Sequence, residues 1–274
     1  MKNLFISLFI LSLFSVNCLA QTDDYKLVWS DEFDKDGKPD DNKWNYEHGF
    51  VRNQEQQWYQ PQNIHCENGL MIITGKREQI KNPNYKPKSE NWKENRKYAN
   101  YSSGCVLTEG RQTWLYGRFE VRAKIPAVKG AWPAIWFRGD RTLNPWPLFG
   151  EIDLLEYYRV KDVPAILANA VYGKQEWSTT HTPVTHFTDR DKDWESRFHI
   201  WRMDWTEDYI RLYLDDELLN EIDVIKTVNP NGFNPFRSHQ HLLINLAIGR
   251  VGESPDETPF PIKYEIDYVR VYQK

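Results

Sequence analysis

Hydrophobic and polar residues alternate along many short stretches of this chain, and this period of two predicts β-strands. Within residues 116–125, Phe119, Val121 and Ala123 fall on one face, and charged side chains occupy the other. Residues 198–205 alternate in the same way. Further strand signals occupy residues 64–75 (broken by an Asn68-Gly69 turn), 209–214, 218–222, 241–248 and 264–272.

Helical periodicity is scarce along the same chain, and turn residues separate the predicted strands. Many short strands without helical crossovers indicate an all-β, antiparallel β-sandwich. Three polar segments, residues 76–100, 174–197 and 226–238, are predicted as long surface loops, the first on the rim of a binding cleft. No linker, repeat or second domain is evident, so residues 21–274 are expected to form one domain.

The first 20 residues have the pattern of a secretory signal peptide. Lys2 provides a positive start, and an apolar run over residues 4–16 is too short to span a membrane. Small residues then precede a predicted cleavage site after Ala20. We therefore expect a secreted or periplasmic protein without a membrane span; the alternative is a lipoprotein anchored at Cys18.

Composition narrows the class of partner. The formal net charge is −4, which argues against nucleic acid or an anionic membrane as the partner. Twelve tryptophans exceed what a core of this size needs, and aromatic rings are suited to stacking on the apolar faces of sugars. The partner expected is a polysaccharide or glycan, bound by a monomer.

The remaining cysteines and histidines do not indicate a metal site. Cys66 and Cys105 lie in predicted strands, and either one disulfide or two buried free thiols fits them. His181 and His186, in a predicted loop, are interpreted as ordinary surface or core residues, as are His239 and His241.

A compact group of acidic residues carries the candidate chemistry. Glu151 and Asp153 share one face of a predicted strand, whereas Glu156 falls out of phase with them. One extra residue, held as a β-bulge near residues 154–155, returns Glu156 to that face. A retaining glycosidase needs two carboxyl groups about 5–5.5 Å apart, one as nucleophile and one as proton donor. The alternative interpretation is a solvated acidic strand edge.

Distance constrains this interpretation. Glu151 and Glu156 are four or five strand steps apart, roughly 13–16 Å between Cα atoms at about 3.3 Å per residue. Their carboxyl groups approach each other only if the strand bends and both side chains lean toward Asp153. The motif therefore predicts a curved sheet as well as a reaction.

Several blocks around the acidic run resemble the laminarinase-like branch of glycoside hydrolase family 16. The family signature is Glu, aliphatic, Asp, one or two hydrophobic residues, then Glu, and this chain has the two-residue, bulged form. Matching blocks at 117–126, 130–136 and 146–151 occur in the family's order. The resemblance extends from residues 29–33 to residues 266–272.

The resemblance implies a jelly roll of two curved antiparallel sheets whose concave face forms a substrate cleft. It implies that Glu151 is the nucleophile, Glu156 the general acid/base and Asp153 the carboxylate that tunes the nucleophile. The chemistry needs no cofactor. A structural calcium ion on the convex side is a further implication, with Asp267 as the candidate ligand.

The same resemblance suggests substrate-binding residues. Trp132 and Trp136 are expected to share a face and line the cleft, the alternative being two core tryptophans. Trp146 is expected beside the same sugar, and Asn53 in a block of polar contacts. Arg118 is placed on a polar strand face, where it either orients the carboxylates or pairs with a neighbouring acid.

Two departures from the family pattern bear on the substrate. Phe149 stands where laminarinases more often carry a small residue, and the strand at 165–173 lacks the histidine found in many β-1,3-glucanases. We expect a secreted retaining endo-β-glycosidase acting on a β-1,3- or mixed-linkage β-1,3-1,4-glucan. The alternative is an endo-β-galactosidase acting on β-galactans, poly-N-acetyllactosamine or O-glycans. A transglycosylase and a non-catalytic carbohydrate-binding protein are the less favoured readings.

Overall fold

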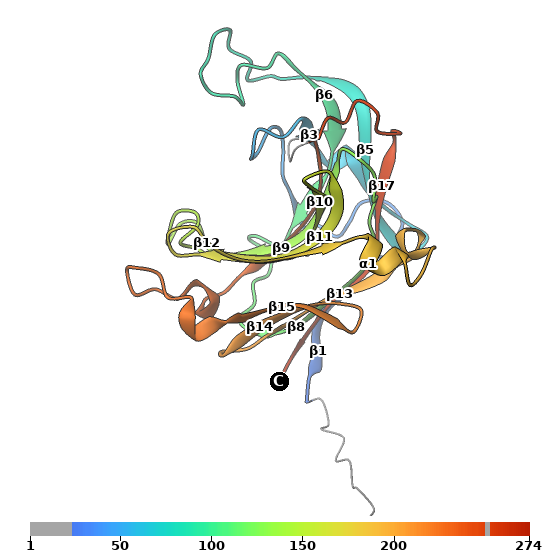
Figure 1. Cartoon of the computed structure of the whole chain (residues 1–274). Coiled ribbons are helices and arrows are strands. Elements are labelled where there is room, and N and C mark those ends of the chain that lie inside the picture. The colour runs from blue at the N-terminus through green and yellow to red at the C-terminus, as the bar shows by residue number, and fades with distance from the viewer. Residues whose placement is uncertain (1–23, 250–252) are drawn as a thin grey trace, which may run out of the picture.

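The computed structural model describes residues 24–249 and 253–274, which form two packed β-sheets (Figure 1). The predicted signal peptide, with Cys18 and the cleavage site after Ala20, lies outside the described residues. No helix within the described part of the chain is long and apolar enough to cross a lipid bilayer.

The larger sheet has ten strands within the described residues, in the order β15-β14-β13-β8-β17-β5-β6-β3, with β1 paired to β17 and β4 paired to β5. Its strands are β1 (Lys26–Asp31), β3 (Gln57–Tyr59), β4 (Ile64–Glu67), β5 (Leu70–Lys81), β6 (Tyr98–Ser103), β8 (Gly117–Lys124), β13 (His199–Trp205), β14 (Tyr209–Leu214), β15 (Glu217–Asp223) and β17 (Ile262–Gln273). Only the pair β3–β6 is parallel among the strand pairs of the described chain.

The smaller sheet has seven strands in the described chain, in the order β12-β11-β10-β9-β16-β7-β2. Its strands are β2 (Asn45–Tyr46), β7 (Cys105–Leu107), β9 (Ala131–Arg138), β10 (Glu151–Val160), β11 (Val163–Tyr172), β12 (Glu176–Pro183) and β16 (His241–Ile248). Short helical turns complete the fold: α1 (Thr185–Thr188), η1 (Pro61–Asn63), η2 (Trp194–Ser196), η3 (Val224–Lys226) and η4 (Pro235–Arg237).

The hydrophobic core lies between the two sheets, as the alternation predicts. In β8, Phe119, Val121 and Ala123 are buried and the intervening charged residues are partly exposed. The Phe119 ring packs edge-on against Phe137 of β9, with ring centroids 4.9 Å apart. The predicted all-β jelly-roll sandwich is confirmed, and in Figure 1 the layer β9–β12 lies over β8, β13, β14 and β15.

Three sequence predictions need correction. The loop predicted at 76–100 is shorter and covers residues 82–97, because β5 continues to Lys81 and β6 begins at Tyr98. The segment 174–197 contains β12 and α1. Cys66 and Cys105 are free and buried on different sheets, so the disulfide alternative is wrong.

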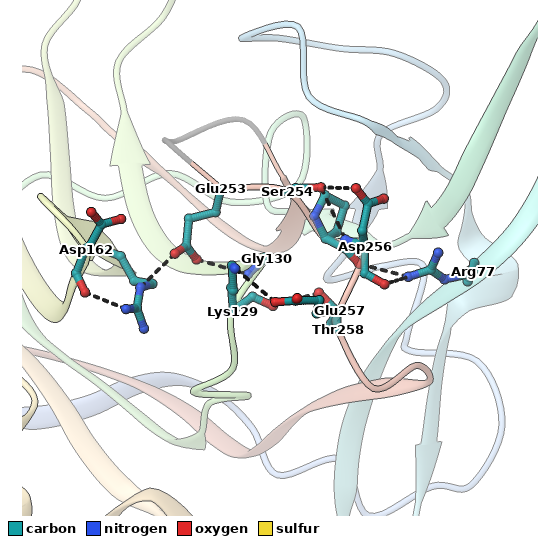
Figure 2. Close-up of polar contacts among 11 residues, drawn as sticks. Arg77, Lys129, Gly130, Asp162, Glu253, Ser254, Asp256, Glu257 and Thr258 are labelled. Carbon is teal, nitrogen blue, oxygen red and sulfur yellow. Dashed lines mark hydrogen bonds and ion pairs between the residues drawn. The ribbon is translucent and has the colours of Figure 1, made fainter.

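Residues 253–258, which precede β17, contact the start of β9 and the end of β10. The Glu253 carboxylate accepts a hydrogen bond from the Gly130 backbone N–H (3.1 Å) and pairs with Arg159 (2.7 Å). The Arg77 guanidinium donates to the backbone carbonyls of Pro255 and Asp256. Figure 2 shows this polar cluster between the strands. It connects the start of β9 and the end of β10 in the smaller sheet to β5 of the larger sheet.

Candidate active site

The outer face of the smaller sheet carries the acidic run on β10. Its pairing with β11 is regular through Asp153 and resumes at Glu156, so a register shift separates the two residues. The pairing with β9 shifts between Asp153 and Leu155. Leu154 and Leu155 are both fully buried. The predicted bulge is therefore present, and Glu151, Asp153 and Glu156 all line one cavity.

Gly150 sets the direction in which β10 begins. Its φ is +76°, a value that L-residues with a side chain rarely adopt. A Cβ atom at this position would lie 2.6 Å from Pro235 Cβ. A larger residue directly before Glu151 would therefore displace the start of the strand or the turn that covers it.

Two neutral donors hold Glu156 between the neighbouring strands. Trp132 Nε1 of β9 donates to Glu156 Oε1 (2.9 Å), and Asn169 Nδ2 of β11 donates to Glu156 Oε2 (2.7 Å). Both oxygens are thus engaged, and the carboxyl group is fixed in orientation. Tyr158, two residues further along β10, packs edge-on against Trp132.

Asp153 is the most deeply buried of the three acids, with 4% of its surface exposed. It lies opposite Trp136 on β9 and Asn169 on β11. Its Oδ2 atom is buried without a hydrogen-bond partner. A buried carboxylate oxygen without a donor is costly, so this environment favours the protonated acid, which offers a hydrogen bond of its own.

A wall of interlocked polar groups borders the cavity on the side of β16 and β3. The Arg52 guanidinium pairs with Glu47 and lies over the Trp136 ring, 5.0 Å from its centroid. Trp136 Nε1 donates to Asn245 Oδ1 (2.7 Å), and Asn245 Nδ2 donates to the Tyr59 hydroxyl (3.0 Å). These side chains are fixed before any ligand enters.

Hydrogen bonds to neighbouring side chains hold the loop that carries Asn53. Asn53 Nδ2 and Gln57 Nε2 donate to the buried Glu55 carboxylate, at 3.3 and 2.6 Å. The Arg96 guanidinium donates to the backbone carbonyls of Glu55 (2.6 Å) and Gln54 (2.9 Å). The segment between β5 and β6, which carries Arg96, therefore supports one border of the cavity.

The charges around Glu151 and Glu156 differ. Burial raises the pKa of Glu151 to about 7, while the positive charges of Arg52 and Arg138 and a hydrogen bond from Trp146 oppose the rise. Burial, and then the negative charge of Glu151, raise the pKa of Glu156 to about 7. Burial and both neighbouring charges raise the pKa of Asp153 well above its usual range. The repulsion between Glu151 and Glu156 is mutual, and the difference between the two acids is that Arg52 and Arg138 act on Glu151.

The cavity has a volume of about 780 Å³, enough for several sugar rings. Four of the predicted substrate-binding residues line it, namely Asn53, Trp132, Trp136 and Trp146. Trp132 and Trp136 share the outer face of β9, as their spacing predicts. Trp146 is 46% exposed, so its ring is available to a ligand.

Arg118 does not belong to this site, and its prediction as a substrate-binding residue is wrong. It lies on β8 of the larger sheet, opposite Asp204 on β13. Its guanidinium binds both Asp204 carboxylate oxygens, at 2.7 and 3.1 Å. Of the two roles considered for Arg118, the structure supports the ion pair with a neighbouring acid.

Asp267 lies at a register shift of β17, where its carboxylate pairs with Arg122 of β8. Among the described residues, no group of three or more His, Cys, Asp or Glu side chains gathers to hold a metal ion. Because Arg122 already neutralises Asp267, the predicted calcium site does not fit the residues around it.

Several residues that line the cavity were not predicted. Arg52 directly precedes the predicted residue Asn53, and Glu55 follows it by two positions. Trp177, Thr179 and His181 also line the cavity, and His181 lies on β12 and not in the predicted loop. Their spacing of two residues is the sequence signal that could have revealed a strand with one face toward the site.

Comparison with known proteins agrees with the resemblance. The family model described as Glycosyl hydrolases family 16 matches residues 53–270. The chain belongs to this family. Family 16 comprises glycoside hydrolases, and the chain's relatives and structural neighbours place it in the laminarinase-like branch. The chain is an endo-acting glycoside hydrolase.

Three similar proteins illustrate the range within family 16. A β-glucanase of Rhodothermus marinus is 33% identical over 91% of this chain and 85% of its own length. The structure of SCLam, a non-specific endo-β-1,3(4)-glucanase, has a TM-score of 0.75 at 34% identity over 92% of both chains. A structure from work on endo-acting O-glycanases, which prominent members of the human gut microbiota express to initiate mucin breakdown, reaches 0.82 at 34% identity, also over 92% of both chains.

Proposed function

We propose that this family 16 enzyme is a retaining endo-β-glycosidase in which Glu151 is the nucleophile and Glu156 the general acid/base. The observation that supports this assignment is that two arginines act on Glu151, whereas the donors that bind Glu156 are neutral. Arg52 and Arg138 favour an ionised Glu151, as attack requires. The charge of Glu151 favours a protonated Glu156, as proton donation requires.

In the first step, a Glu151 carboxylate oxygen attacks the anomeric carbon of the sugar. The glycosidic C–O bond breaks, and Glu156 transfers its proton to the departing oxygen. The shortened chain leaves with a new hydroxyl group, and a glycosyl ester remains on Glu151. The Trp132 and Asn169 bonds hold Glu156 in place for this transfer.

In the second step, the ester has consumed the negative charge of Glu151. The pKa of Glu156 therefore falls, because one cause of its elevation has gone. Glu156 now accepts a proton from a water molecule, whose oxygen attacks the anomeric carbon and releases Glu151. Two inversions restore the original β-configuration.

The substrate proposed first is a β-1,3-glucan or a mixed-linkage β-1,3-1,4-glucan. The Rhodothermus β-glucanase and SCLam support this choice, since each resembles the chain over most of its length. The aromatic rings of Trp132, Trp136 and Trp146 in one cavity are suited to stacking on a β-linked glucan.

A second candidate is an endo-β-galactosidase acting on β-galactans, poly-N-acetyllactosamine or O-glycans. The specific observation in its favour is the TM-score of 0.82 with the O-glycanase structure, against 0.75 with SCLam at equal identity. Phe149, and Asn169 of the strand that lacks the histidine found in many β-1,3-glucanases, both line the cavity. Glucose and galactose differ only at O4, so one contact in the cavity is enough to select between them.

Product analysis on a small panel of polymers tests the proposal. The purified protein is incubated with laminarin, mixed-linkage glucan, agarose, poly-N-acetyllactosamine and mucin O-glycans, with Glu151→Gln as the control, and products are separated by chromatography. Oligosaccharides from either glucan are expected. Products from the galactose polymers alone would transfer the assignment to the second candidate, and products from no polymer would contradict both.

The cellular location and the domain organisation of the enzyme are proposed from its sequence. A signal peptide over residues 1–20 would direct the protein to the periplasm or the exterior, where polysaccharides are accessible. Residues 21–274 would then form one catalytic domain acting as a monomer. Mass spectrometry of the mature protein would reveal an N-terminus at Gln21, or a lipid on Cys18 if the alternative holds.

Asn169 offers a prediction about pH dependence. Its hydrogen bond favours the ionised form of Glu156 and so lowers the pKa of that acid, which stands at about 7. Asn169→Ala removes this donor, so the pKa of Glu156 rises. Because Glu156 must be protonated, the alkaline limb of the kcat/KM profile is expected to move up by about half to one pH unit. Trp132→Phe, which removes the other donor, should shift the limb in the same direction; a downward shift in both variants would contradict the role of Glu156.

A further inference from the structure

Strand β12 forms the outer edge of the smaller sheet and presents one face to the cavity. Trp177, Thr179 and His181 alternate along it, are exposed, and line the cavity. Trp177 is 46% exposed, an unusual position for a large aromatic side chain. Among the described residues, no hydrogen bond or ion pair engages any of these three side chains.

The rest of the structure holds β12 firmly in place. β12 pairs with β11 along its whole length, without a register shift. Asn220 Nδ2 of β15 donates to the backbone carbonyls of both Ala168 (2.8 Å) and Ser178 (3.2 Å), which bridges β11, β12 and the larger sheet. The exposed face of β12 is therefore preorganised, which reduces the entropic cost of binding a ligand.

The register aligns this face with the catalytic acids. Trp177 lies opposite Val171, which lies opposite Glu151. Thr179 is aligned through Asn169 with Asp153, and His181 through Leu167 with Glu156. Each β12 residue is two strand spacings, roughly 9–10 Å, from the acid with which it is aligned. A sugar chain that crosses the sheet at the acids reaches β12 within one or two rings.

The side chains on the two sides of Glu151 and Glu156 differ in how many hydrogen bonds and ion pairs they make. On the side of β16 and β3, Arg52, Glu55 and Asn245 are locked in hydrogen bonds and ion pairs. Such a rigid polar wall is suited to holding the sugar that undergoes distortion and attack. On the side of β12, an exposed tryptophan and two unpaired polar groups are suited to a unit that binds and then departs.

We propose that the exposed face of β12 is the binding subsite for the leaving-group sugar, with Trp177 as its stacking platform and Thr179 and His181 as hydrogen-bonding groups. The aromatic ring stacks on the apolar face of the sugar, while the hydroxyl and imidazole contact its hydroxyl groups. This inference rests on the proposed function, because it assigns one side of the bond that Glu151 and Glu156 would cleave.

The test compares a substrate that places sugars on the leaving-group side with one that places none there. Laminarin places sugars on both sides of the acids, whereas β-laminaribiosyl fluoride carries only fluoride on the leaving-group side. In Trp177→Ala, the loss of kcat/KM on laminarin should exceed the loss on the fluoride by about tenfold. Trp177→Phe should recover most of the loss, because a phenyl ring also stacks.

Tyr98→Ala is the matched control, since Tyr98 is an aromatic residue 38% exposed on β6, outside the cavity. It should leave both substrates unaffected. Equal losses on the two substrates in Trp177→Ala, or no loss on laminarin, would overturn the inference while the proposed function stands. A wild-type protein inactive on every polymer would overturn both. If only poly-N-acetyllactosamine is cleaved, that polymer and the β-fluoride of the disaccharide GlcNAc-β-1,3-Gal, in which galactose bears the fluorine, replace the glucan pair, with the same expected ratio.

Discussion

Glu151→Gln and Glu156→Gln are each expected to reduce kcat on the polymer by about 10³-fold or more while the protein stays folded. The amide at position 151 cannot attack the anomeric carbon, and the amide at position 156 cannot supply a proton to the leaving oxygen. Steady-state rates of reducing-end formation measure both losses. The fold should survive, because glutamine is nearly isosteric with glutamate.

The two variants can be told apart by the leaving group. A substrate whose leaving group needs little protonation, such as β-laminaribiosyl fluoride, should restore much of the first step in Glu156→Gln and none of it in Glu151→Gln. Glu67→Gln, an exposed change on β4 outside the cavity, serves as the matched control. Near-normal turnover in either folded active-site variant would refute the assigned roles. Thermal melting curves establish that each variant is folded.

Asp153→Ala is expected to reduce kcat by about 10²-fold, a smaller loss than at the two glutamates. Burial and the charges of Glu156 and Glu151 raise the pKa of Asp153 well above its usual range, which favours its protonated form. A protonated Asp153 can donate a hydrogen bond to a neighbouring carboxylate and stabilise the ionised nucleophile. Alanine removes the donor and leaves a small cavity beside Trp136 and Asn169.

Asp153→Asn separates these two effects. The asparagine amide keeps the volume and still donates a hydrogen bond, so it should retain more activity than alanine. The acidic limb of the pH profile, which reports ionisation of Glu151, should move to higher pH in Asp153→Ala, because the donor that favours the ionised form has gone. Wild-type kcat in Asp153→Ala, or an unmoved acidic limb, would contradict this role.

The catalytic strand was predictable because its chemistry and its geometry constrain each other. Glu156 is out of phase with Glu151 and Asp153 in any regular strand, so a common site required a bulge, and the register shift lies between Asp153 and Glu156. The fold was predictable from alternation, because strands such as β8 bury Phe119 and Val121 against a hydrophobic core.

β12 was missed for a physical reason. It is an edge strand whose inward side chains, Ser178, Thr180 and Thr182, are themselves polar, so no hydrophobic alternation marks it. Pairing with β11, and not burial of an apolar face, specifies its conformation. A segment of this kind is indistinguishable from a loop when only the period of hydrophobic residues is considered.

The incorrect assignment of Arg118 has a different origin. Alternation correctly placed it on the polar face of β8, but the identity of its partner depends on tertiary structure. Asp204 is 86 positions away in the sequence and becomes its neighbour only through the pairing of β8 with β13. Arg52 shows that tertiary structure also brings unpredicted residues to the site. It comes close to the β10 acids only because the loop before β3 folds against Trp136.

The configuration of the first product tests the central claim most directly. Polymer is mixed with an excess of enzyme, so that cleavage outpaces mutarotation, and proton NMR follows the anomeric protons of the new reducing ends. A double displacement through Glu151 predicts that the β-anomer appears first and then equilibrates with the α-anomer. Initial appearance of the α-anomer would mean a single inverting displacement and would contradict a glycosyl ester on Glu151.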